Sequence, residues 1–105
     1  MRMRKCGFAL IGLGSFLAAS TATVHAADTQ NGAKLYAQHC LSCHGPNGKG
    51  SFAGVPDFAR SNTLFRSDGA LFASIKTGKG AMPGYFGILR ERDLFDVIAY
   101  LRTLN

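Results

Sequence analysis

Five consecutive residues constrain this chain more than any others: Cys40, Leu41, Ser42, Cys43 and His44. In a chain with an export signal, the Cys-x-x-Cys-His pattern indicates covalent attachment of haem. Two thiols three positions apart can form thioethers with the two vinyl groups on one edge of a porphyrin. The imidazole of His44 then lies beneath the ring, where it can bind the iron. The motif therefore predicts one covalently attached haem c with its iron.

Three other interpretations of the two cysteines explain less of the pattern. A structural zinc site needs about two more Cys or His ligands at short spacing, and only His39 is spare. A thioredoxin-like redox pair should follow a strand, and no strand pattern precedes Cys40. A disulfide between Cys40 and Cys43 suits an oxidising compartment, but it leaves His44 without a role.

The first 26 residues have the features of a secretory signal peptide. Residues 1–5 are mostly basic, residues 6–19 are largely apolar, and residues 24–26 (Val-His-Ala) fit the small-x-small cleavage pattern. We therefore expect residues 1–26 to be removed and residues 27–105 to form one domain. The alternative is an uncleaved membrane anchor, but the apolar run is short for a span of about 20 residues. Cleavage predicts a periplasmic bacterial protein with no stable membrane insertion.

The charge balance argues against a nucleic-acid partner. The full chain has 12 Lys and Arg against 6 Asp and Glu, but three of the basic residues belong to the predicted signal peptide. Nine basic residues then face six acidic ones, and no run of them interleaves with aromatic residues as on a nucleic-acid surface. Lys49, Lys76 and Lys79 either steer acidic partner proteins to the haem edge or are ordinary solvated side chains.

Residues 27–105 have the pattern of helices joined by loops, and no stretch resembles a strand. The expected helices cover residues 28–40, 67–76 and 91–104, with Asp28 or Thr29 and then Ser67 as N-caps. The last helix has apolar residues at a spacing of three and four. Gly32 costs the first helix about 1 kcal/mol relative to alanine. It is either a flaw in helix propensity or a point of close approach between helices.

One axial position of the iron remains after His44, and two residues compete for it. Met82 is the sole methionine of residues 27–105 and stands in a loop with glycines and Pro83. Such a loop suits a ligand better than a core filler, and it lies far enough along the chain to reach the other haem face. His39 directly precedes Cys40, so it could hardly reach that face. His44 and Met82 are therefore the predicted axial ligands, a pair known from cytochromes c.

Residues 28–105 resemble a class I cytochrome c of the small bacterial, single-haem kind. The matching stretches are Gly32-x-x-x-Tyr36, Cys40-Leu41-Ser42-Cys43-His44-Gly45, Gly54-Val55-Pro56, residues 75–83 (Ile-Lys-Thr-Gly-Lys-Gly-Ala-Met-Pro) and residues 96–101 (Asp-Val-Ile-Ala-Tyr-Leu). The resemblance implies an all-α cytochrome c fold, with three main helices and loops wrapped around one haem. One departure is Arg90, where relatives often place a Ser, Thr or Asp cap, and it predicts a weaker start to the last helix.

The same resemblance implies particular contacts. The first and last helices should cross, so that Gly32 and Tyr36 meet Val97 and Tyr100. The Pro56 carbonyl should accept a hydrogen bond from the His44 imidazole and fix its orientation. Haem-packing residues are expected to be Tyr36, Phe58 and Ile75.

A six-coordinate iron leaves one-electron exchange as the expected activity, and the protein is not expected to be an enzyme. The partners would be redox proteins with acidic docking surfaces, such as a periplasmic dehydrogenase or an oxidase. The chain would be either a free carrier, itself a monomer, or the cytochrome subunit of such an enzyme. The alternative is an open-haem peroxidase or gas-binding protein. That function would require Met82 to be off the iron and distal acid–base residues to be present, and residues 27–105 contain no histidine beyond His39 and His44.

Overall fold

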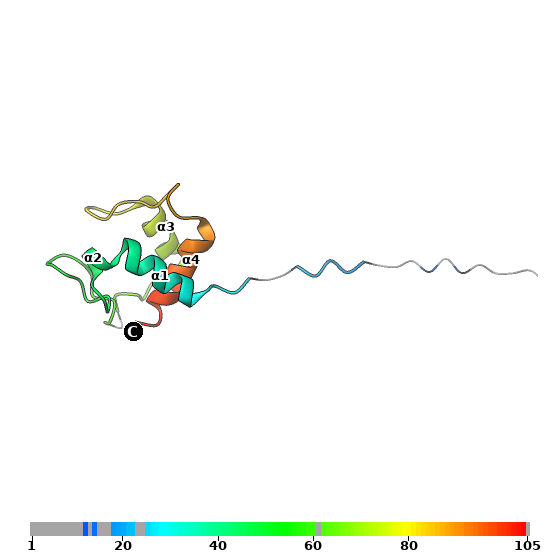
Figure 1. Cartoon of the computed structure of the whole chain (residues 1–105), viewed down its shortest axis with the longest axis horizontal. Coiled ribbons are helices and arrows are strands. Elements are labelled where there is room, and N and C mark those ends of the chain that lie inside the picture. The colour runs from blue at the N-terminus through cyan, green and yellow to red at the C-terminus, as the bar shows by residue number, and fades with distance from the viewer. Residues whose placement is uncertain (1–11, 13, 15–17, 23–24, 61, 105) are drawn as a thin grey trace, which may run out of the picture.

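The computed structural model describes residues 12, 14, 18–22, 25–60 and 62–104. It contains four helices: α1 (Thr29–His39), α2 (Leu41–His44), α3 (Asp68–Thr77) and α4 (Glu91–Leu101) (Figure 1). Within those residues the β pairing is limited to one isolated bridge, so the all-α expectation is confirmed. Most of the predicted signal peptide lies outside the described residues. No helix among those described combines the length and the apolarity that crossing a membrane requires.

The N-caps form as the sequence predicts. The Asp28 carboxylate accepts hydrogen bonds from the backbone N–H groups of Gln30 and Asn31, and the Ser67 hydroxyl accepts one from Ala70. These side chains satisfy N–H groups that have no partner within the helix.

The last helix ends at Leu101, three residues before the predicted Leu104. Thr103 and Leu104 donate their N–H groups to carbonyls three residues back, which is the tighter 3₁₀ spacing common at helix ends. The guanidinium of Arg102 also bonds the carbonyls of Leu64 and Arg66 and the Asp68 carboxylate, which connects this end to the loop before α3 and to the first residue of α3.

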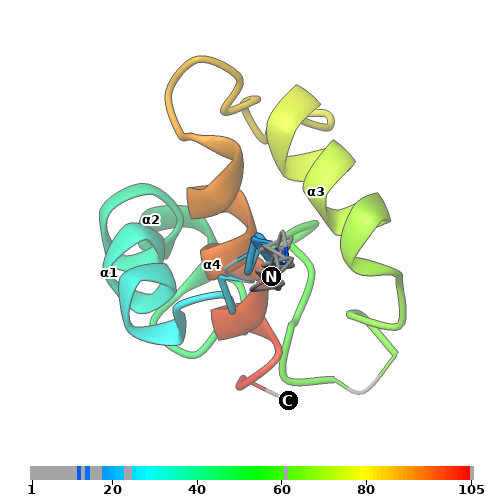
Figure 2. The ribbon, with the colours of Figure 1, turned by 90° about the vertical axis from the view of Figure 1, so that its right-hand side faces the viewer.

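Helix α4 lies between α1 and α3 (Figure 2). A Cβ atom built on Gly32 would lie 2.0 Å from the backbone oxygen of Asp96 and 2.9 Å from the Cβ of Tyr100. The rings of Tyr36 and Tyr100 meet one turn further on, with centroids 5.3 Å apart. The predicted crossing is therefore confirmed, and Gly32 is the point where the two backbones touch.

The apolar core gathers around this crossing and continues onto α3. Its most deeply buried side chains come from α1 and α4, and further members come from α3 and from the loops on either side of it. The buried set is Tyr36, Leu64, Leu71, Ile75, Tyr85, Leu94, Val97, Ile98 and Leu101.

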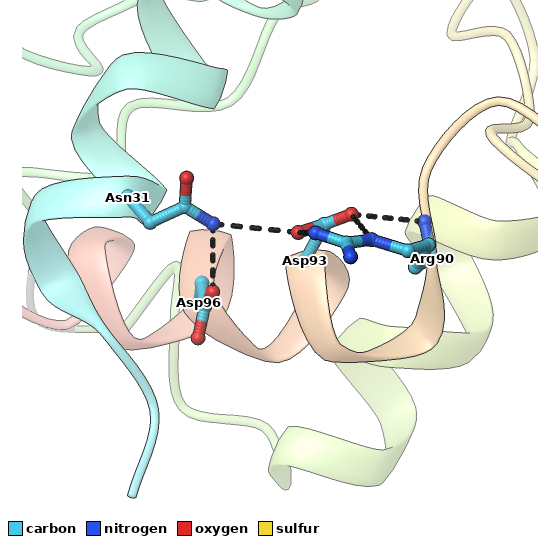
Figure 3. Close-up of polar contacts among 4 residues, drawn as sticks. All are labelled: Asn31, Arg90, Asp93 and Asp96. Carbon is cyan, nitrogen blue, oxygen red and sulfur yellow. Dashed lines mark hydrogen bonds and ion pairs between the residues drawn. The ribbon is translucent and has the colours of Figure 1, made fainter.

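A polar cluster of four side chains joins the starts of α1 and α4 (Figure 3). The Asn31 amide donates to the carboxylates of Asp96, at 2.8 Å, and Asp93, at 3.3 Å. Asp96 also accepts from the backbone N–H of Asp28, at 2.7 Å. Asp93 accepts from the backbone and the guanidinium of Arg90. Arg90 is thus no defect at the helix start, because its pairing with Asp93 takes the place of the missing cap.

This pairing predicts a pH dependence of stability. Hydrogen bonds from Arg90 lower the pKa of Asp93 from 3.8 to about 2. A lowered pKa in the folded state stabilises the protein above about pH 4, and that contribution disappears as the pH falls toward 2. Arg90→Gln should therefore lower the free energy of unfolding at pH 6, and only by a small amount, because solvent screens the largely exposed guanidinium.

Denaturant titrations from pH 7 to pH 3 measure this difference. Arg92→Gln is the matched control, because it removes the same charge from the first turn of α4, where the described residues give Arg92 no ion pair. A gap between Arg90→Gln and the parent that stays constant down to pH 3 would contradict the proposed linkage to Asp93.

Candidate functional site

The attachment motif occupies a single helical turn. Cys40 lies between α1 and α2, and Cys43 and His44 both donate their backbone N–H groups to its carbonyl, at 3.2 and 2.9 Å. Residues three apart on a helix lie on the same side, so the two sulfurs share one face of this turn. Both thiols are free, with Cys40 half-buried and Cys43 exposed. Burial raises the pKa of the Cys40 thiol to about 11, with the Cys43 thiol adding to the shift.

The imidazole of His44 is buried and stacks on Phe58, with ring centroids 4.8 Å apart and planes inclined by 17°. Burial lowers the pKa of this imidazole, so the ring is neutral at neutral pH. Its Nδ1 atom is buried and finds no hydrogen-bond partner among the described residues. A buried polar nitrogen without a partner is rare in folded proteins, and a neutral imidazole is the form that binds iron.

This donor set fits haem c. Two free thiols stand at thioether spacing, and the buried neutral imidazole that follows them can bind iron. The predicted hydrogen bond from His44 to the Pro56 carbonyl is not formed in this structure, where Pro56 is exposed. That bond stays a prediction for the haem-bound protein.

The other expected haem neighbours gather around the same turn. The Tyr36 hydroxyl donates to the Gly45 carbonyl at 2.6 Å, directly after His44. Phe58 covers the imidazole as described, and its backbone N–H bonds the carbonyl of Gly48 at 2.7 Å. Ile75 is buried on α3, where its carbonyl accepts from the backbone of Tyr85. All three lie in or against the core, and their contact with haem stays a prediction.

Met82 stands in a tight loop after α3. Met82 and Lys79 exchange two backbone hydrogen bonds of 3.0 Å, which closes a four-residue turn. Gly78, with φ +79°, begins this loop, and a Cβ there would lie 2.6 Å from the nitrogen of Gly84. Met82 itself is half-buried and packs against the core. The backbone of this loop is therefore fixed by hydrogen bonds and by close contacts that only glycine permits.

Tyr85 links this loop to the attachment segment. Its hydroxyl donates to the backbone carbonyl of His39, at 2.9 Å, and the two rings meet edge to face with centroids 5.7 Å apart. Burial raises the pKa of Tyr85, with Cys40 and Cys43 adding to the shift, so the hydroxyl stays protonated at neutral pH. Sequence reasoning missed this residue, because its partner is a backbone carbonyl 46 positions away.

Of the three lysines considered for steering, Lys76 is engaged within the molecule. Its ammonium lies 2.9 Å from the Glu91 carboxylate and over the rings of Phe72 and Phe86. Lys49 and Lys79 are exposed. The positive charge available to a partner is therefore smaller than the sequence suggests.

Comparisons with known proteins agree with this site. A family model described as cytochrome c oxidase, cbb3-type, subunit III matches residues 27–101. Cytochrome c6 of Nostoc sp. strain PCC 7120 is 33% identical over 96 residues, which cover 88% of this chain and 85% of that protein. Cytochrome c6 of Synechocystis sp. strain PCC 6803 is 35% identical, with 88% and 78% covered.

Two further proteins differ in how much of their length is matched. The FixP subunit of the cbb3-type cytochrome c oxidase of Bradyrhizobium sp. strain ORS 278 is 35% identical over 81 residues, but the match spans only 28% of that subunit. The solved structure of the KustC0563 c-type cytochrome superposes with a TM-score of 0.66 at 26% identity and covers 70% of this chain and 96% of that one. With a fold, a motif and relatives that agree, the chain belongs to the class I cytochromes c and carries one covalently attached haem c.

Proposed function

We propose that this cytochrome is a soluble one-electron carrier whose iron is held between His44 and Met82. Haem c supplies reversible exchange of one electron between Fe(II) and Fe(III), and a thioether ligand favours the reduced state and raises the potential. With His44 and Met82 as its two protein ligands, the iron would have no position left for oxygen, peroxide or a substrate.

The observation that carries this proposal is the construction of the Met82 loop. Met82 shares two backbone hydrogen bonds with Lys79 and is followed by Pro83, while Gly78 and Gly84 are packed backbone to backbone. A ligand on such a loop would keep its place in both oxidation states, because the backbone has little freedom to move. Little structural rearrangement would then oppose electron transfer.

The proposal extends to the location and the partners. The leader-like residues 1–26 support export to the bacterial periplasm, and a mass equal to residues 27–105 plus one haem would check this. A dehydrogenase is one candidate donor. A cytochrome oxidase is a candidate acceptor, because a relative is named as an oxidase subunit. Exposed Lys49 and Lys79 suit acidic docking surfaces.

The optical spectrum and carbon monoxide binding of the haem-loaded protein test the ligand set. We expect the oxidised protein to show the weak near-infrared band of methionine bound to Fe(III). The reduced protein should bind carbon monoxide slowly or not at all, because a side chain must first leave the iron. Rapid binding together with absence of the band would instead support the open-haem peroxidase or gas-binding class.

A further inference from the structure

We propose that Tyr85 is a positioning residue, which holds the Met82 loop against the haem-attachment segment and thereby limits how often Met82 leaves the iron. The inference rests on the proposed ligation by Met82, and it assigns a role to a side chain that does not itself touch the metal.

The Tyr85 hydroxyl joins the two segments that carry the predicted iron ligands. The Met82 loop (residues 78–89) and the attachment segment (residues 28–44) carry Met82 and His44, the two predicted iron ligands. In the described part of the chain, the bond from Tyr85 to the His39 carbonyl, at 2.9 Å, is the one hydrogen bond between them. The Tyr85 residue is only 9% exposed, so water competes little for this bond. His39 directly precedes Cys40, so the bond ends at the attachment motif itself.

Tyr85 is also bonded to α3. Its backbone N–H donates to the Ile75 carbonyl at 3.0 Å, and the next residue, Phe86, donates to Lys76 at 3.0 Å. Tyr85 therefore bonds α3 through its backbone and the end of α1 through its side chain. A movement of the Met82 loop away from the attachment segment has to break the hydroxyl bond.

The backbone between Tyr85 and Met82 is short and stiff. Only Pro83 and Gly84 separate them, and proline fixes its own φ angle. A Cβ on Gly84 would lie 2.7 Å from the Thr77 carbonyl oxygen, so this backbone is packed against the end of α3. A displacement of Tyr85 would therefore be transmitted to Met82 through the two residues between them.

The variant Tyr85→Phe tests this role, because it keeps the buried ring and removes only the hydroxyl. Loss of one such bond should multiply the population with Met82 off the iron by about two- to tenfold. The association rate of carbon monoxide with the reduced protein should rise by the same factor, since binding requires that population. The near-infrared methionine band should remain in the oxidised variant, and thermal unfolding should verify that it is folded.

Two control variants separate this role from a general loss of stability. Asn31→Ala removes the hydrogen bonds to Asp93 and Asp96 at the far end of the α1–α4 pair and should leave the carbon monoxide rate unchanged. His39→Ala removes the ring beside Tyr85 but keeps the accepting carbonyl, so its rate should rise less than that of Tyr85→Phe.

The outcomes are distinguishable. A parental rate in Tyr85→Phe, in a protein whose parent shows the methionine band, would overturn the role of Tyr85 and leave the ligation standing. An equal acceleration in Asn31→Ala would also overturn it, because general loosening would explain both. A parent without the band and with rapid carbon monoxide binding would overturn the ligation itself.

Discussion

Gly32→Ala is expected to destabilise the folded protein severely, by about 3 kcal/mol, at the upper end of the cost for overpacking a core. The added Cβ would lie 2.0 Å from the Asp96 backbone oxygen and 2.6 Å from its carbonyl carbon. Backbone atoms cannot turn away as a side chain can, so α1 and α4 would have to separate. Separation would also weaken the contact between Tyr36 and Tyr100 and the bonds of Asn31 to α4.

Chemical denaturation of the haem-loaded protein measures this effect, and the thermal midpoint should fall by on the order of 10 °C. Gly69→Ala is the matched control, because Gly69 is also helical and a Cβ there meets nothing within 4 Å. It should be neutral or stabilising by about 0.5 kcal/mol, as expected when alanine replaces glycine in a helix. Equal stability of Gly32→Ala and the parent would show that the helices do not touch as described.

The sequence predicted the parts of this molecule that depend on local spacing. The Cys-x-x-Cys-His motif, the caps Asp28 and Ser67, and the apolar periodicity of α4 are all readable within a few positions. Each depends on groups that are close along the chain, such as a cap side chain and the N–H groups two or three residues on. The short helix α2 was not predicted, because four residues are too few for a periodic pattern.

Polar contacts over long sequence separations could not be predicted from local patterns. The bond of Asn31 to Asp96 joins residues 65 positions apart, and that of Tyr85 to His39 joins residues 46 apart. The capping rule predicts a weak helix start at Arg90 because it considers only that residue, whereas Asp93 and Asn31 complete the arrangement. Gly32 lies between these two cases. The sequence of the first helix alone allows either a flaw in helix propensity or a close contact between two helices. The resemblance to a family favoured contact, and the crossing with α4 confirmed it.

The sequence also does not show which lysine charges are paired within the folded chain. Counting residues treats Lys49, Lys76 and Lys79 alike, but only the folded chain brings Glu91, Phe72 and Phe86 to Lys76. An exposed ion pair of this kind contributes little stability. It does mean that Lys76 offers a partner less net charge than an unpaired lysine would.

Met82→Ala is expected to change the chemistry of the protein more than any other single substitution. If Met82 binds the iron, its removal opens one axial position, so the near-infrared methionine band should vanish and the reduction potential should fall. The carbon monoxide association rate should rise by about 10- to 1,000-fold, because the open form would no longer be a minor state. The haem should stay attached through Cys40 and Cys43, so the variant should still fold and retain its haem under acid–acetone extraction.

The control for this variant is His39→Ala, which removes the rival ligand. It should retain the band, the potential and slow carbon monoxide binding, because His39 is tied to the attachment segment, where its carbonyl accepts from Tyr85. Loss of the parental spectrum in His39→Ala, with no change in Met82→Ala, would assign the sixth position to His39. Both variants keep His44 and the two thioethers, so a difference between them in the methionine band identifies the group that fills the second axial position.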